Sequence, residues 1–253
     1  MMSNTVLAEL KNGVLRLTIN RPEKRNALNS ETVNAFHDAL ERAELDDGVR
    51  VVAIFGAGKD FCAGADLAEL LDSVNCSPDE NAAQAQRLGD VFVKIRNLPK
   101  AVVAVVTGRA LAGGCGFASA CDIVIAHEQA SFGYPEVRRG FVPAMVMAML
   151  RRTVGEKVAF DLVGTGRLLS ASEAAQIGLV SRVLPAEGFD DLVDDLLDSI
   201  GSSSLSAMAL IKRQLYELDG RSFEEGIALG AKVNAVARAT PDFKDSVGKF
   251  LKK

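Results

Sequence analysis

The sequence predicts an α/β fold in which helices cover both faces of a largely parallel sheet. Two continuous apolar runs of strand length, KAVVAVVTG (100–108) and DIVIAHE (122–128), lie among segments with the apolar spacing of amphipathic helices. Uninterrupted apolar strands are typical of sheets buried on both faces, and their alternation with helices is typical of α/β proteins. From about residue 188 every pattern is helical, so a helical region is expected to follow the sheet.

The first hundred residues alternate between strand and helix patterns. The expected order is strand 14–20, helix 31–45, strand 49–56 and helix 80–97. A turn-rich connector, RPEKRNALN, follows the first strand, and Asn29 or Ser30 can cap the first helix. Phe36 and Leu40 then fall on one face of that helix, which predicts that this face packs on the sheet.

The later elements are marked by capping signals. After strand 100–108, the pair Gly113-Gly114 starts a helix that runs toward Ala120. Capping boxes and caps are expected at SASE (170–173), SFEE (222–225) and Thr240-Pro241, and 180–185 is the last clear strand. The last helix carries Phe243, Val247 and Phe250 on one face. A short tail cannot bury such faces alone, so it should pack on the core, on another subunit, or on both.

Bulk properties exclude several classes of partner. The chain has 253 residues and a net charge of −4, with 29 Lys plus Arg that are mostly scattered, which argues against nucleic acid. The N-terminal segment lacks a basic region followed by a long apolar core, and no run reaches about 18 apolar residues. We therefore expect no membrane partner and a cytoplasmic location.

The residue inventory also excludes several chemistries. There are two histidines, His37 and His127, so a histidine-rich metal site is ruled out. The four cysteines fit neither a C-x-x-C motif nor a disulfide framework, and small buried thiols are the expected alternative. No nucleophile elbow or phosphate-binding loop exists, and GAGKDF has Phe61 where a dinucleotide fingerprint needs its third glycine.

Two stretches of small residues can expose backbone amides to a ligand. FCAGADL (61–67) can begin a helix at Asp66-Leu67, and RALAGGCGFASACD (109–122) begins one at Gly113-Gly114. Amides that converge from two such helix starts form an oxyanion hole, a set of donors that stabilises a developing negative charge. The alternatives are an ordinary glycine loop in the first stretch and close helix–strand packing in the second.

A third stretch, SFGYPEVRRGFVPA (131–144), contains Glu136 in partly apolar company. Desolvation there would raise its pKa toward a value useful for acid–base catalysis. The alternative is an ordinary surface salt bridge between Glu136 and Arg138 or Arg139.

The ordered set of motifs resembles the enoyl-CoA hydratase/isomerase, or crotonase, superfamily. It comprises NRPEKRNAL (20–28), GAGKDFCAGADL (56–67), GRALAGGCGFASACD (108–122), YPEVRRGFVPA (134–144) and LLSASEAAQIGLVSRVLP (168–185). The resemblance implies a crotonase-like spiral of ββα units with a C-terminal helical trimerisation region. It divides the chain into a crotonase core over 1–187, which binds and processes acyl-CoA, and a C-terminal helical region over 188–253.

The resemblance also implies a coenzyme A thioester as substrate. The amides of Ala65 and Gly113 would bind the thioester oxygen, and Glu136 would exchange a proton at the α-carbon. The other residues expected to contact substrate or CoA are Lys24, Ala27, Ala63, Asp66, Leu67, Leu111, Gly114, Gly116, Pro135, Phe250 and Lys253. Phe250 and Lys253 match an aromatic and basic pair that often reaches CoA from a neighbouring subunit. The implied assembly is a homotrimer or a dimer of trimers, without a metal or separate cofactor, since CoA is part of the substrate.

Gly116 departs from the two-glutamate pattern of this superfamily. Two-glutamate hydratases carry a carboxylate there and another at the position of Glu136, and this chain keeps only the second. The favoured interpretation is hydration of a 2-enoyl-CoA to a 3-hydroxyacyl-CoA, because PEVRRGFVPA is closest to hydratases that also have glycine. A Δ3,Δ2-enoyl-CoA isomerase with a single glutamate is the second interpretation. A non-catalytic acyl-CoA or RNA binder is the third; the retained Glu136 and the net charge of −4 argue against it.

Overall fold

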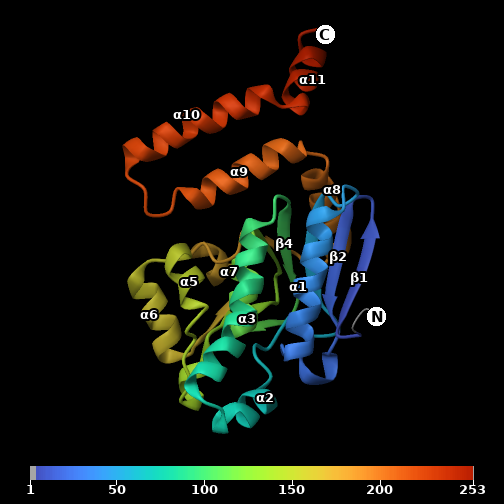
Figure 1. Cartoon of the computed structure of the whole chain (residues 1–253). Coiled ribbons are helices and arrows are strands. Elements are labelled where there is room, and N and C mark those ends of the chain that lie inside the picture. Colours follow the sequence, from blue (N-terminus) through green and yellow to red (C-terminus); the bar gives the residue numbers. More distant parts are fainter. Residues whose placement is uncertain (1–3, 253) are drawn as a thin grey trace.

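Two β-sheets organise the chain in the computed structural model, which describes residues 4–252 (Figure 1). The larger sheet contains, in spatial order, β1 (Val6–Lys11), β2 (Val14–Ile19), β3 (Val51–Gly56), β4 (Ala101–Val106), β6 (Ile123–His127) and β9 (Arg182–Leu184). The smaller sheet contains β5 (Arg109–Leu111), β7 (Ser131–Gly133) and β8 (Leu168–Ser170). The larger sheet is parallel except for the β1–β2 pair, which confirms the predicted α/β class.

Helices cover the larger sheet on both faces, as predicted. Along β3, Val52 and Ile54 face one cluster of buried side chains, whereas Val51 and Ala53 face another. The first cluster includes residues of α1 (Ser30–Leu45) and α3 (Pro78–Asn97), and the second includes residues of α8 (Phe189–Gly201). Because successive side chains of a strand point to opposite faces, the fully apolar sequence of β3 requires both layers.

Capping residues fix where the helices begin. The Asn29 side chain accepts a hydrogen bond from the Thr32 amide and caps α1 as predicted. The predicted capping boxes at Ser170 and Ser222 begin α7 (Ala171–Gln176) and α10 (Phe223–Ala239). Thr240 caps α11 (Pro241–Phe250). These signals act within four residues and are therefore readable from the sequence.

The predicted strand 100–108 is present as β4, which ends two residues earlier than expected. β4 ends at Val106, and the chain turns at Thr107-Gly108 into β5, which joins the smaller sheet. The Gly108 carbonyl accepts a 2.8 Å hydrogen bond from the Ser131 amide, which ties this turn to the start of β7. β1 is a strand that the sequence pattern did not predict, because only its first residue, Val6, is buried.

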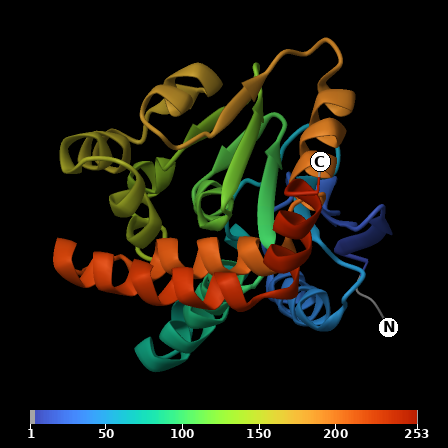
Figure 2. The same cartoon turned by 90° about the horizontal axis from the view of Figure 1, so that it is seen from above.

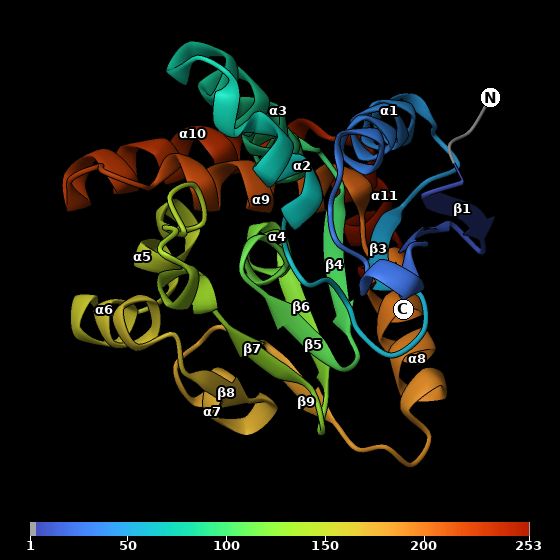
Figure 3. The same ribbon diagram turned by 90° about the horizontal axis from the view of Figure 1, so that it is seen from below.

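The remaining short elements surround the end of the molecule near α2. They are 3₁₀-helices η1 (Pro22–Lys24), η2 (Ser73–Asn75) and η3 (Pro135–Arg139), and helices α2 (Leu67–Asp72), α4 (Gly113–Ala120), α5 (Met147–Thr153) and α6 (Glu156–Thr165). Seen from below, α4 lies centrally, with α2 on one side and the strands of the smaller sheet on the other (Figure 3). All three candidate stretches lie within these elements, the strands of the smaller sheet and the loops that connect them.

The C-terminal helices lie at the opposite end of the molecule from α2 (Figures 1 and 2). α9 (Leu205–Glu217) runs beside α10, and α11 follows at the end of the chain. Within residues 4–252, α10 and α11 contain no buried residue, and Phe223, Ile227 and Phe250 are more than half exposed. Among the helices described, none combines the length and the apolar character needed to cross a membrane.

Candidate active site

Three loops meet beside the start of α4. The Leu28 amide donates to the Gly64 carbonyl at 2.8 Å, and the Leu111 amide donates to the Cys62 carbonyl at 2.9 Å. These bonds place segments 25–28, 62–66 and 111–114 side by side, although they lie far apart in the sequence. The two stretches of small residues therefore belong to one site.

Two backbone amides in these loops are close together and unpaired. A Cβ built on Gly113 would lie 3.6 Å from the Ala65 nitrogen, and one built on Gly64 would lie 3.1 Å from the Gly113 nitrogen. Among the hydrogen bonds of the described residues, neither the Ala65 nor the Gly113 amide has an acceptor. Gly113 is also the first residue of α4, where amides carry a positive partial charge. This arrangement can stabilise a negative oxygen placed between the two amides.

The turn before Gly113 is held in an uncommon conformation. Ala112 has φ 52° and ψ −126°, a region that usually requires glycine and costs about 1–3 kcal/mol for other residues. Its amide donates to the Gly133 carbonyl at 2.8 Å, which helps to hold this conformation. The Ala112 Cβ would lie 2.8 Å from a Cβ on Gly64, so residue 64 must be a glycine here. The two loops thus fit together only with glycine at position 64.

Glu136 is buried without an ion-pair partner. It is 9% exposed, and its Oε2 atom has no hydrogen-bond partner in residues 4–252. Arg138 turns instead toward the Thr165 carbonyl, and the described part of the chain shows no ion pair between Glu136 and Arg138 or Arg139. The salt-bridge interpretation of Glu136 is therefore wrong. Burial raises the pKa of this carboxyl above its usual 4.5, because no charge offsets the loss of solvent.

Strand pairing and a hydrogen bond connect the segment of Glu136 to the loop that bears the unpaired Gly113 amide. Gly133, at the end of β7, pairs with Leu111 of β5 and accepts the hydrogen bond from Ala112. Glu136 follows Gly133 by three residues, in η3, where Pro135 occupies the first turn. The thiol of Cys115, in α4, is fully buried; this burial, with a smaller effect of the Glu136 charge, raises the Cys115 pKa to about 12. The pairing of β5 with β7 thus links the segment that bears Glu136 to the turn that precedes α4.

The small residues predicted to contact substrate divide into two groups. Ala27, Ala63 and Leu111 are half-buried in the three meeting loops. Gly114 is buried, and a Cβ there would lie 2.3 Å from the Cys62 carbonyl oxygen. Close packing, the alternative raised for this stretch, thus explains Gly114 but not Gly113. Gly116 is also buried.

The polar and exposed candidates near α2 differ in whether they are free to contact a ligand. Lys24 and Leu67 are exposed, so both are accessible to a ligand. The Asp66 carboxylate is already engaged, since it accepts a 2.9 Å hydrogen bond from Arg21 and caps α2 through the Ala68 amide. Burial raises the pKa of Asp66, but the bonds from Arg21 and Ala68 outweigh it, and the pKa is lowered overall.

The C-terminal candidates are not brought to this site within one chain. Phe250 lies in α11, at the end of the molecule opposite α2, and is 78% exposed (Figure 1). Lys253 lies outside the described residues. The structure therefore does not bring Phe250 to the candidate site of its own chain, and a contribution of Phe250 and Lys253 to a neighbouring subunit stays a prediction.

Sequence reasoning missed the side chains that hold these loops in place. Asn26 is fully buried, with φ 58°, and donates to the carbonyls of Ala57 and Asp60 at 2.9 and 2.7 Å. Asp60 accepts two 2.7 Å hydrogen bonds from the guanidinium of Arg109. An asparagine in a turn-rich connector was the available signal, but its partners are more than thirty residues away.

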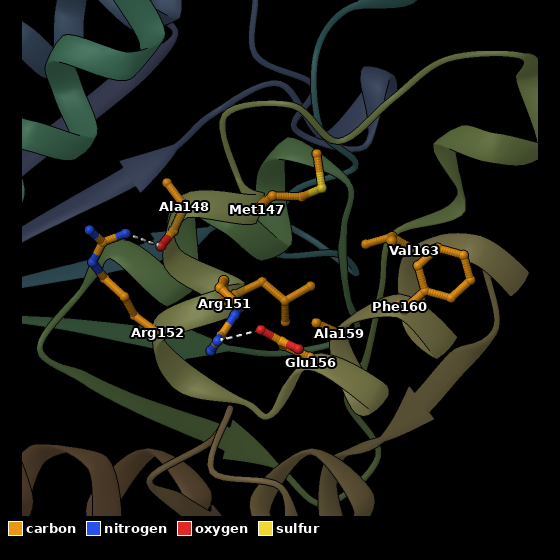
Figure 4. Close-up of a pocket in the computed structure, with 9 residues that line it drawn as sticks. Met147, Ala148, Arg151, Arg152, Glu156, Ala159, Phe160 and Val163 are labelled. Carbon is orange, nitrogen blue, oxygen red and sulfur yellow. Dashed lines mark hydrogen bonds and ion pairs between the residues drawn. The ribbon is translucent and has the colours of Figure 1, made fainter.

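A separate surface pocket lies between α5 and α6 (Figure 4). Its lining is mainly apolar and includes Met147, Leu150, Phe160 and Val163. An ion pair of 2.8 Å between Arg151 and Glu156 lies at this pocket. None of these residues was predicted as a site residue, and the unpaired amides are not part of this lining.

The comparisons with known proteins agree with the motifs. The family model described as enoyl-CoA hydratase/isomerase matches residues 9–253. A relative from Thermus thermophilus is 40% identical over 243 residues, which cover 96% of each chain. The 2,3-dehydroadipyl-CoA hydratase of Escherichia coli is 33% identical and covers 95% of this chain and 92% of its own. The crystal structure of an enoyl-CoA hydratase from Mycobacterium smegmatis superposes with a TM-score of 0.93 at 31% identity, covering 98% and 96% of the two chains. The crotonase-like fold predicted from the motifs is thus confirmed, and the chain belongs to the enoyl-CoA hydratase/isomerase family.

Proposed function

We propose that this protein adds water to a 2-enoyl-CoA and forms a 3-hydroxyacyl-CoA. The observation that carries the proposal is the buried, unpaired carboxyl group of Glu136, joined through Gly133 to the turn that bears the free Gly113 amide. Such a carboxyl group can transfer a proton, and the oxyanion hole can stabilise the charge that develops on a thioester oxygen. The names of the enoyl-CoA hydratases among the relatives support the same reaction.

In the proposed reaction, the thioester oxygen accepts hydrogen bonds from the amides of Ala65 and Gly113. The ionised Glu136 accepts a proton from water as the water oxygen bonds to the β-carbon. The π electrons move onto the thioester, and the resulting enolate oxygen is held by the two amides. Glu136 then donates the proton to the α-carbon and returns to its ionised form. The net change is the addition of one water, with no separate cofactor.

One observation favours isomerisation as the second candidate. Glu136 is the carboxylate that the site segments leave unpaired, since Asp60 and Asp66 are engaged by Arg109 and Arg21. A single carboxylate suffices to remove a proton from one carbon of a 3-enoyl-CoA and return it to another. A non-catalytic acyl-CoA binder gains nothing from burying an unpaired carboxyl group, whose desolvation costs free energy.

The decisive experiment is incubation in ¹⁸O-labelled water with crotonyl-CoA and, separately, with 3-hexenoyl-CoA. Hydration predicts solvent oxygen at the β-carbon of the first substrate, detected by mass. Isomerisation predicts the 2-enoyl product from the second substrate without a gain of oxygen. The absence of turnover with short, branched and aromatic acyl-CoA substrates would contradict the enzymatic proposal.

We further propose that the protein assembles as a homotrimer or a dimer of trimers through α9, α10 and α11. The exposed apolar side chains Phe223, Ile227 and Phe250 support this, because a monomer would leave them in water. Light scattering should report about three or six times the 26.9 kDa mass of one chain. A stable monomer at micromolar concentration would contradict the assembly. The cytoplasmic location stays a prediction, and one relative, from Dictyostelium discoideum, is named as mitochondrial.

A further inference from the structure

Val146 occupies the space in which any side chain on residue 116 would begin. A Cβ built on Gly116 would lie 2.0 Å from Cγ1 and 2.7 Å from Cβ of Val146, but 3.6 Å from its Cα. Non-bonded carbon atoms favour separations of about 3.5–4.0 Å. The Val146 side chain, rather than its backbone, therefore excludes every residue larger than glycine from position 116.

This contact lies on α4, the helix whose first residue bears the unpaired Gly113 amide. Gly116 follows Gly113 by three residues in α4, which places both on nearly the same side of the helix. Val146 is 4% exposed and is the N-cap residue of α5, ten residues after Glu136. The apolar side chain of Val146 thus fills the space beside the first turn of α4.

We propose that Val146 is a specificity-determining residue, which limits the site to one carboxylate by filling the space over Gly116. The inference rests on the proposed enoyl-CoA chemistry. The other carboxylates of the site loops are engaged: Asp66 by Arg21 and Asp60 by Arg109. With valine at position 146, Glu136 is the one carboxylate of the site that can orient a water molecule or carry a proton. A second carboxylate at position 116 would accept a hydrogen bond from the attacking water and favour hydration over a double-bond shift.

The test uses Gly116→Glu, Val146→Gly and the double variant Gly116→Glu/Val146→Gly. Glycine is required at 146, because alanine would keep the Cβ atom 2.7 Å from the new side chain. Val146 makes no side-chain cap hydrogen bond, and glycine is acceptable at an N-cap position. The matched control combines Gly116→Glu with Val154→Gly, which removes a valine of similar burial, 6% exposed, from the other end of α5.

The first readout is thermal unfolding, which does not depend on activity. Gly116→Glu should lower the unfolding midpoint by at least about 5 °C through overpacking. The double variant should be more stable than the sum of the single effects predicts, whereas the Val154 control should be additive. Additivity in both pairs would overturn the proposed contact.

The second readout is the product ratio. Relative to wild type, the double variant should raise the ratio of hydration to isomerisation at least about tenfold. An unchanged ratio in a folded, active double variant would overturn the specificity role and leave Val146 as a packing residue. A failure of the proposed function is distinguishable, because wild type itself would then neither hydrate nor isomerise any enoyl-CoA; that result would also overturn the specificity role.

Discussion

The Lys212 ammonium lies 2.7 Å from the carboxylate of Asp122, and both side chains are largely buried, at 5% and 16% exposure. Lys212 also donates to the carbonyls of Ile95 and Lys100, and Tyr216 donates to the other oxygen of Asp122 at 2.6 Å. Lys212 and Tyr216 both belong to α9, whereas Asp122 directly precedes β6. This network therefore fixes α9 to the larger sheet.

Lys212→Met should destabilise the protein strongly. The variant leaves the Asp122 carboxylate without its cation, and removing one member of a buried pair costs about 3–5 kcal/mol. For a chain of this size, the unfolding midpoint should fall by roughly 6–20 °C. The control is Arg213→Met, because Arg213 makes an exposed ion pair with Glu217 on the same helix. Equal midpoints for the two variants, measured by calorimetry, would show that the buried network contributes nothing.

Glu136→Gln should lower kcat by about 10²–10⁴-fold and leave the binding of an acyl-CoA nearly unchanged. The amide keeps the shape of the carboxyl group but cannot exchange a proton. Stopped-flow turnover and calorimetric titration with a non-reactive acyl-CoA measure the two quantities. Glu156→Gln is the matched control, since Glu156 is exposed and belongs to the pocket between α5 and α6. A loss below about tenfold would remove Glu136 as the proton carrier.

The pH dependence of stability should also report on Glu136. Its pKa in the folded protein is raised above 4.5 by burial, so the native state keeps this proton to higher pH than the unfolded chain does. The resulting stabilisation is present below the unfolded pKa and is lost as pH rises through the folded pKa. Glu136→Gln cannot titrate, so its midpoint relative to wild type should increase as pH rises above 4.5. A difference that does not change from acid to neutral pH would contradict the raised pKa.

Gly113→Ala should abolish most turnover without unfolding the protein. The new methyl group would make ordinary contacts, 3.6 Å from the Ala65 nitrogen, and would thus enter the space where the thioester oxygen is proposed to bind. Alanine keeps the Gly113 amide, but its methyl group would push the thioester oxygen away from the two donors. Losing one oxyanion-hole hydrogen bond costs about 2.7–4 kcal/mol, so kcat should fall by about 10²–10³-fold. Gly155→Ala is the control, because a Cβ there meets no atom within 4 Å. If Gly113→Ala retains full activity, these amides do not form the hole.

The sequence by itself determined the fold class, the main helix starts and the candidate carboxyl group. Asn29, Ser170 and Ser222 cap helices as predicted, because a capping side chain bonds to an amide only three residues away. The motif order was also sufficient to identify the family, since five motifs follow one another in order between residues 20 and 185.

Only the tertiary structure decided how distant segments complete the site. It separated the open Gly113 from the packed Gly114, removed the salt-bridge interpretation of Glu136, and placed Val146 over Gly116. It also placed α11, which bears Phe250, at the end of the molecule opposite α2 (Figure 1). These outcomes depend on contacts between residues that are tens of positions apart. Such contacts form only when the packed layers bring the segments together, so no local pattern encodes them.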